Sequence, residues 1–125
     1  MAYQSYRDLV AWQKARQWVR EVYQVSRRLP ADERFGLTSQ LRRAAVSVPA
    51  NIAEGQARSG PREFGHHVSV ALGSLAEVET LLILAGDLQY LRPEDIQTPL
   101  SHAQEIGRIL NGLLQSLQRA GAARS

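Results

Sequence analysis

Three arginines share one face of the first predicted helix and could bind phosphate groups. Arg16, Arg20 and Arg27 fall within about 40° of one another at the ~100° per residue of an α-helix. Arg42, from the second predicted helix, is a further candidate for the same basic surface. Such a surface would bind RNA or DNA without reading its sequence, with an affinity that falls steeply as salt rises. The alternative interpretation is the solvated charged face of any water-exposed helix.

Aromatic side chains that could stack on bases are few. Trp12 follows the apolar spacing of the first helix, so we expect it to be buried. Trp18, Tyr3 and Tyr6 then remain as the candidates for stacking. The sequence therefore favours phosphate contacts over base contacts.

A second polar cluster follows the second predicted helix. Arg43, Ser47 and Asn51 lie four residues apart and form one ridge, and Glu54 comes within the next turn. One interpretation is a satisfied polar network that supports a kink at Pro49, with Glu54 paired to Arg43 or to a nearby arginine. The other is a subunit contact in which arginine from one chain meets Glu54 from another.

Metal ligation has little support. Glu63 and His66 have the Glu-x-x-His spacing of di-iron bundles, but a working site needs two such motifs and two further inward carboxylates. His102 and Glu105 have the reverse order. We therefore expect Glu63 and His66 to be surface residues in the first turn of a helix, His67 to be a packed or hydrogen-bonded histidine, and no metal or other cofactor to be bound.

Composition excludes further chemistry. The 125 residues contain no cysteine, which rules out disulfides, thiolate metal sites and cysteine nucleophiles. The sequence also has no Gly-x-Ser-x-Gly motif and no glycine-rich phosphate loop. We expect no enzymatic activity.

Positive charge is concentrated in the first half of the chain. Residues 1–62 contain eleven Lys and Arg and five Asp and Glu, a net charge of +6, whereas residues 63–125 have a net charge of −3. No uninterrupted apolar stretch approaches the ~20 residues that span a bilayer, so we expect a cytoplasmic protein that makes no membrane contact.

Apolar residues at three-and-four spacing predict four helices, at about residues 6–28, 37–57, 61–89 and 93–119. Their short connections favour a single-domain, all-α, antiparallel up-down-up-down four-helix bundle. Pro49 predicts a kink or a local break in the second helix, and Gly121 to Ser125 should form a frayed tail. Gly73 and Ser74 predict a closely packed neighbour against the third helix, either the second helix or another subunit.

Three stretches resemble the four helix bundle protein family, first noticed as reading frames in intervening sequences of 23S ribosomal RNA genes. They are Asp8 to Ala15 (DLVAWQKA), Phe35 to Gly55 (FGLTSQLRRAAVSVPANIAEG) and Ala71 to Glu79 (ALGSLAEVE). The same family contains the accessory variability protein of diversity-generating retroelements.

The resemblance implies a small bundle that assembles as a ring-like homopentamer without known enzymatic activity. In the retroelement members the ring is basic, binds nucleic acid and associates with a reverse transcriptase, so RNA, DNA and a reverse transcriptase are the implied partners. Our leading hypothesis is a non-enzymatic oligomer whose arginine-rich surface binds nucleic acid or a nucleic-acid-processing partner. The alternative is a purely structural or protein-interaction module that assembles a ring without nucleic acid.

Overall fold

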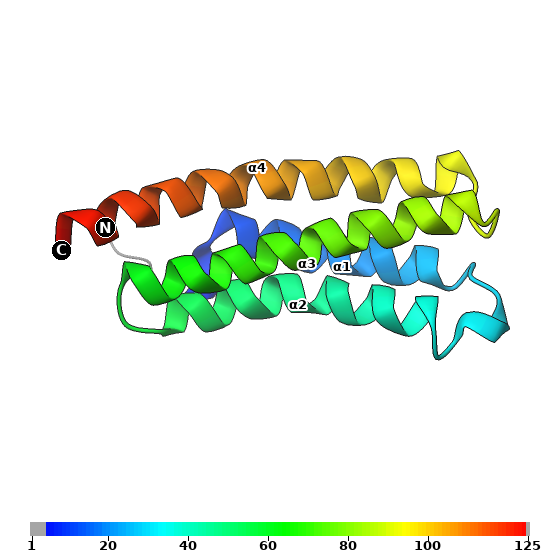
Figure 1. Ribbon diagram of the computed structural model, residues 1–125, viewed down its shortest axis with the longest axis horizontal. Helices are drawn as coiled ribbons and strands as arrows, with labels where there is room; N and C mark the ends of the chain where they lie inside the picture. Colours follow the sequence, from blue (N-terminus) through cyan, green and yellow to red (C-terminus); the bar gives the residue numbers. More distant parts are fainter. Residues whose placement is uncertain (1–4, 125) are drawn as a thin grey trace.

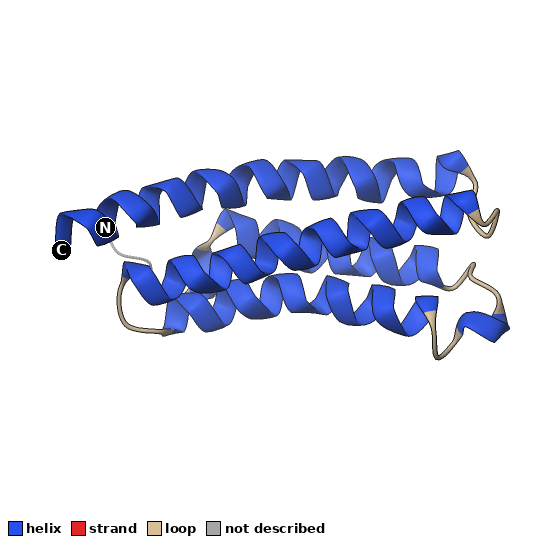
Figure 2. Ribbon diagram, in the orientation of Figure 1, coloured by secondary structure: helices blue, strands red, loops and turns tan. Residues whose placement is uncertain are grey.

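Four long α-helices dominate the computed structural model, which describes residues 5–124. They are α1 (Val10–Ser26), α2 (Leu37–Ala57), α3 (Pro61–Asp87) and α4 (Pro93–Arg124), and two short 3-10 helices, η1 (Tyr6–Asp8) and η2 (Ala31–Glu33), precede α1 and α2. No strand occurs within this range (Figure 2). The all-α, four-helix prediction is confirmed.

The helices lie side by side, and the chain runs one way along α1 and α3 and the opposite way along α2 and α4 (Figure 1). Each helix packs against the helix that precedes or follows it in sequence, and α4 also packs against α1. This arrangement encloses one apolar core between the four helices.

The first helix begins later than the sequence suggested. Leu9 is extended, with φ −75° and ψ 128°, and it separates η1 from α1. The side chain of Ser5 accepts a hydrogen bond from the backbone N–H of Arg7, so it caps the 3-10 turn. The predicted single helix over 6–28 is therefore wrong: its α-helical part is Val10–Ser26.

The second helix has the predicted bounds, Leu37–Ala57. Pro49 lies inside it and the helix continues through that residue, so the alternative of a local break at Pro49 is wrong. The kink at Pro49 stays a prediction.

The last two helices begin at the predicted prolines, Pro61 and Pro93. α3 ends at Asp87, and the turn that follows holds Gln89 at φ 64°. α4 continues to Arg124, past the predicted end near residue 119. The prediction of a frayed tail from Gly121 is therefore wrong as far as Arg124, because these residues are helical. Alanines surround Gly121, and their high helix propensity offsets the cost of the glycine.

The core contains large aliphatic side chains and one tryptophan. Its largest fully buried members are Trp18, Val22, Leu41, Val48, Ile52, Val68, Val78, Leu82, Ile106 and Leu110. Trp18 is 1% exposed, and its indole N–H donates to the backbone oxygen of Pro99 at 3.0 Å. This bond joins α1 to the first turns of α4.

α2 and α3 pack closely around Gly55. A Cβ atom added at Gly55 would lie 2.6 Å from His67 Cβ and 3.0 Å from Phe64 Cδ1. Gly73 is different, because an added Cβ there would meet no atom within 4 Å. The expectation that the second helix packs against Gly73 and Ser74 is therefore wrong for Gly73, which lies on the outer face of α3, but holds for Ser74, whose Oγ lies 2.9 Å from Ser47 Oγ on α2. The alternative of another subunit against Gly73 stays a prediction.

One helix, α3, is long and apolar enough to cross a membrane by length and composition. Its most apolar window has a mean hydropathy of 1.8, but only 39% of that window is buried in the bundle. Glu77 and Glu79 interrupt it, and α3 packs against both α2 and α4, as the core helix of a bundle does. The uncovered part of α3 leaves apolar side chains on the surface.

Candidate functional site

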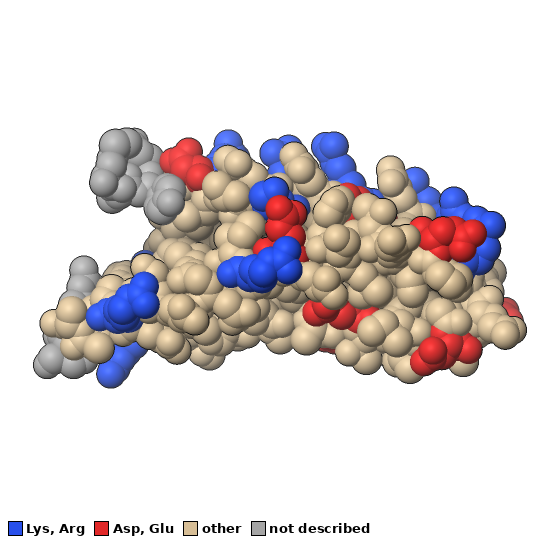
Figure 3. Space-filling view, turned by 90° about the horizontal axis from the view of Figure 1, so that it is seen from above, with Lys and Arg blue, Asp and Glu red and all other residues tan. Residues whose placement is uncertain are grey.

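The outer side of α1 carries a face without acidic residues. Between Gln13 and Arg28 every exposed residue is glutamine or arginine. Arg16, Arg20 and Arg27 are all exposed, and within the described residues none of them forms an ion pair. Lys and Arg side chains project along one long edge of the molecule, as Figure 3 shows. We call this surface the arginine face: Gln13, Arg16, Gln17, Arg20, Gln24 and Arg27.

Two shallow grooves run along the arginine face and share Arg20. The first groove is lined by Arg7, Trp12, Gln13, Arg16, Gln17 and Arg20. The second is lined by Val19, Arg20, Tyr23, Gln24, Arg27 and Val46. Arg20 borders both, so the two grooves lie next to each other along α1 and together we call them the track.

The two tryptophans have the opposite environments from those predicted. Trp18 is buried and so cannot stack on a base, whereas Trp12 is half-buried and lines the first groove. The Arg16 guanidinium lies 5.6 Å from the centroid of the Trp12 ring, and the Tyr6 ring meets the same indole edge-on at 5.1 Å. Trp12 therefore helps to hold Arg16 in place.

Arg42 is held by contacts within its own chain. Its Nε donates to Ser26 Oγ at 2.8 Å, and its guanidinium lies 4.9 Å from the centroid of the Tyr23 ring. Ser26 is buried and its hydroxyl donates in turn to the backbone oxygen of Tyr23. Among the four predicted nucleic-acid-binding arginines, Arg42 thus has a structural role that Arg16, Arg20 and Arg27 do not have.

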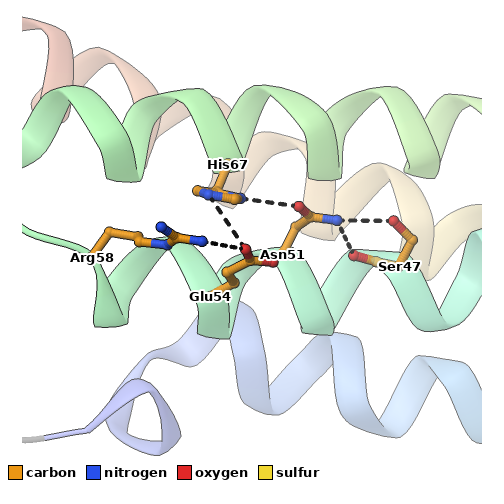
Figure 4. A network of polar contacts seen from close by, with 5 residues as sticks. All are labelled: Ser47, Asn51, Glu54, Arg58 and His67. Atoms are coloured by element: carbon orange, nitrogen blue, oxygen red, sulfur yellow. Dashed lines mark hydrogen bonds and ion pairs between the residues drawn. The ribbon is translucent and has the colours of Figure 1, made fainter.

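The polar ridge of α2 joins α2 to α3 (Figure 4). Asn51 Nδ2 donates to both the backbone oxygen and Oγ of Ser47, each at 2.9 Å, and Ser47 Oγ lies 2.9 Å from Ser74 Oγ. Because Nδ2 is the donor of Asn51, its Oδ1 accepts from His67 Nδ1, 3.2 Å away. Two of the predicted ridge residues are therefore bonded within one chain.

Glu54 continues this network but does not contact Arg43. Arg58 donates to Glu54 Oε2 at 2.9 Å, and His67 Nε2 lies 3.9 Å from the same oxygen. The hydrogen bond from Arg58, and then the electrostatic influence of the neighbouring His67 imidazole, lower the pKa of Glu54. Arg43 is exposed and has no ion-pair partner within residues 5–123.

His67 and Ser74 complete the network from α3. The sequence predicts a hydrogen-bonded His67, and this is confirmed, but it does not identify Ser74 as the partner of Ser47. Their separation of seven residues, two helical turns, is the signal that places both on one face of α3.

Replacing Asn51 with alanine should lower the free energy of unfolding by about 1–2 kcal/mol, because it removes the group that links Ser47 to His67. Urea unfolding followed by circular dichroism measures the change. Asn111→Ala, at an exposed position of α4, is the matched control and should change stability by about 0.5 kcal/mol or less. Equal effects of the two substitutions would show that the network adds nothing to stability.

The titratable residues do not gather into a metal site. Within the described residues no group of three or more His, Asp or Glu side chains could hold a metal ion. Glu63 and His66 are exposed in the first turns of α3, as predicted. His102 pairs with Glu21 across α1 and α4 at 2.7 Å, and Lys14 pairs with Glu105 at 3.2 Å.

Comparison with known proteins identifies a family and a similar solved fold. The family model described as "23S rRNA-intervening sequence protein" matches residues 7–112. A crystal structure from Bacteroides thetaiotaomicron, described as a protein with unknown function from the S23 ribosomal protein family, shares 22% sequence identity and a TM-score of 0.78, covering 84% of this chain and 98% of that one. No curated protein matches the chain. At this identity the solved structure shows a shared fold.

Proposed function

Because the chain belongs to the 23S rRNA-intervening sequence protein family, we propose that it is a non-enzymatic, oligomeric four-helix bundle that binds nucleic acid through the arginine face. The observation that carries this proposal is the set of exposed arginines on α1, Arg16, Arg20 and Arg27, which have no carboxylate partners in the part of the chain that the structure describes. An arginine without such a partner is available to a phosphate group.

The chemistry of the arginine face suits a phosphate backbone. Guanidinium groups bind phosphate oxygens with two parallel hydrogen bonds, and the intervening glutamine amides add neutral donors. The aromatic rings beside the track already contact arginines of the same chain: Trp12 contacts Arg16, and Tyr23 contacts Arg42. The face therefore favours backbone contacts over base stacking, and we expect little preference for sequence.

Assembly would multiply these contacts. Each chain has a formal charge of +3, so the homopentamer that the family resemblance implies would carry about +15 in the cytoplasm. Several arginine faces on one particle would bind a long strand with higher avidity than a single face does. A nucleic-acid-processing protein that binds the same strand would be held next to the oligomer.

Changing Arg16, Arg20 and Arg27 together to glutamine tests the proposal. The loss of three phosphate contacts should weaken binding to RNA or duplex DNA at least tenfold. It should also make the negative slope of log affinity against log salt shallower by about 2 to 3. The measurement is a fluorescence-anisotropy titration of labelled strands of unrelated sequence at several salt concentrations.

The chain offers a control with the same change of charge. Arg62, Arg108 and Arg119 are exposed on α3 and α4, and changing all three to glutamine should leave most of the affinity and the slope intact. Equal losses in the two triple variants would mean that net charge, and not the arginine face, drives binding. If the unaltered protein binds no strand even at low salt, the alternative of a purely structural or protein-interaction module is the better explanation.

A further inference from the structure

A groove lies where the first turns of α3 face the last turns of α4, at the end of the bundle where α4 runs past the start of α3 (Figure 1). Its volume is about 490 Å³, which is within the range of small-molecule pockets. All of its lining residues come from these two helices. We call it the α3–α4 groove, and its lining includes Arg62, Gly65, His66, Ser69, Leu114 and Leu117.

The floor of the groove is apolar because a glycine of α3 faces two leucines of α4. A Cβ atom added at Gly65 would lie 3.6 Å from Leu114 Cδ1 and 3.9 Å from Leu117 Cβ. Both leucines pack against the core and are only partly buried. Since Gly65 has no side chain to cover them, a hydrocarbon chain that enters the groove would remove apolar surface from water on both sides of the contact.

The rim of the groove supplies polar side chains that have no partner. Arg62, His66 and Ser69 follow one another at four and three residues, so they lie along one side of α3, and Gln118 lines the groove from α4. None of these four side chains forms a hydrogen bond or an ion pair with the residues that the structure describes. The His66 ring meets the ring of His67 edge-on, with 5.4 Å between the centroids.

The charges around the groove favour an anion. No aspartate or glutamate lines it. Glu63 is the only acidic residue of α3 before Glu77, and α4 has none after Glu105. Arg119 adds an exposed arginine to the last turns of α4. The groove therefore complements a molecule with an anionic head and a hydrocarbon body.

We propose that the α3–α4 groove binds a free fatty acid with a chain of medium length. The Arg62 guanidinium would bind both carboxylate oxygens, and an N–H of the His66 imidazole, one turn later, would donate to the same head group. The hydrocarbon chain would lie over Leu114 and Leu117. Arg62 and Ser69 are seven residues apart, about 10 Å along the helix axis, which matches an extended octanoate.

The apolar floor distinguishes this ligand from the one in the proposed function. A phosphate group of a nucleic acid would satisfy Arg62 but would leave the two leucines in contact with water. The α3–α4 groove also lies on other helices than the arginine face of α1. The inference therefore goes beyond the proposed function and does not depend on it.

Calorimetric titration of the full-length protein with sodium octanoate, below the concentration at which it forms micelles, tests the proposal. We expect saturable binding of one octanoate per chain. The neutral analogue 1-octanol should bind at least tenfold more weakly, because it lacks the charge that pairs with Arg62. Acetate, which has the charge without the chain, should show no saturable binding.

Two substitutions on the rim test the position of the head group. Arg62→Gln should weaken octanoate binding at least tenfold, whereas Arg108→Gln, at an exposed arginine of α4 outside the groove, should leave it unchanged. Ser69→Glu places a carboxylate on the rim and should weaken binding similarly, with Ser101→Glu on α4 as its control. All four positions are exposed, so far-ultraviolet circular dichroism should show unchanged helix content.

Photo-crosslinking with a diazirine derivative of octanoate locates the bound chain. Mass spectrometry should find the label within residues 61–69 and 114–122. Label elsewhere, no saturable binding to the unaltered protein, or equal losses in Arg62→Gln and Arg108→Gln would overturn the proposal. So would displacement of octanoate by a labelled RNA or DNA strand that itself binds more weakly to Arg62→Gln, since the groove would then be part of a nucleic-acid surface.

Discussion

Replacing Trp18 with alanine is expected to lower the free energy of unfolding by about 3–5 kcal/mol, a large part of the stability of a domain of this size. The side chain is 1% exposed and is the largest in the core. The substitution would leave a cavity between α1 and α4 and would remove the hydrogen bond from the indole to Pro99. Urea unfolding at a fixed protein concentration measures the loss, because the proposed self-association would also add stability.

Two further substitutions show which property of Trp18 matters. Trp18→Phe keeps an aromatic ring but loses the N–H donor, so it should cost less than Trp18→Ala. Trp12→Ala should also cost less, because Trp12 is half-buried on the groove side of α1. A greater loss at Trp12 than at Trp18 would contradict the packing described above.

Replacing Gly55 with alanine is expected to destabilise the protein by about 1–3 kcal/mol, although alanine has the higher helix propensity. The new Cβ would lie 2.6 Å from His67 Cβ, so α2 and α3 would have to move apart. That movement would also disturb the hydrogen bond between Asn51 and His67. Thermal and urea unfolding both report the change.

Gly112 provides the control for Gly55. It is an exposed glycine of α4, and an added Cβ would meet no atom within 4 Å. Gly112→Ala should therefore stabilise the protein by up to about 1 kcal/mol through helix propensity alone. Stabilisation by both alanines would mean that α2 and α3 do not pack closely at Gly55.

The helices could be predicted from the sequence better than the faces that they bury. Apolar spacing and the prolines at positions 61 and 93 gave α2 its bounds and α3 and α4 their first residues. In α1 the buried residues are Ala11, Ala15, Trp18, Val22 and Ser26. Small side chains at positions 11 and 15 give a weak hydrophobic signal, so the large Trp12 and Val19 suggested a stripe rotated away from the true one.

For the candidate site, too, the sequence predicts the exposure of single residues better than their contacts with other helices. Exposure of Arg16, Arg20 and Arg27 follows from the helical period within one segment. The bond of Arg42 to Ser26 depends on how two helices meet, which the local spacing does not contain. The pair Glu54 and Arg58 does have the four-residue spacing of a helical ion pair and could have been found from the sequence alone.

The serine and asparagine bonds between α2 and α3 also restrict how these helices can slide. Aliphatic side chains tolerate a shift along the helix axis, because one methyl group replaces another as a neighbour. A slip of one turn would separate Ser47 from Ser74 and Asn51 from His67 at the same time, and only the bonds between Asn51 and Ser47, which lie within α2, would remain. These two polar rungs therefore select a single alignment of the hairpin during folding, independently of what they add to its final stability.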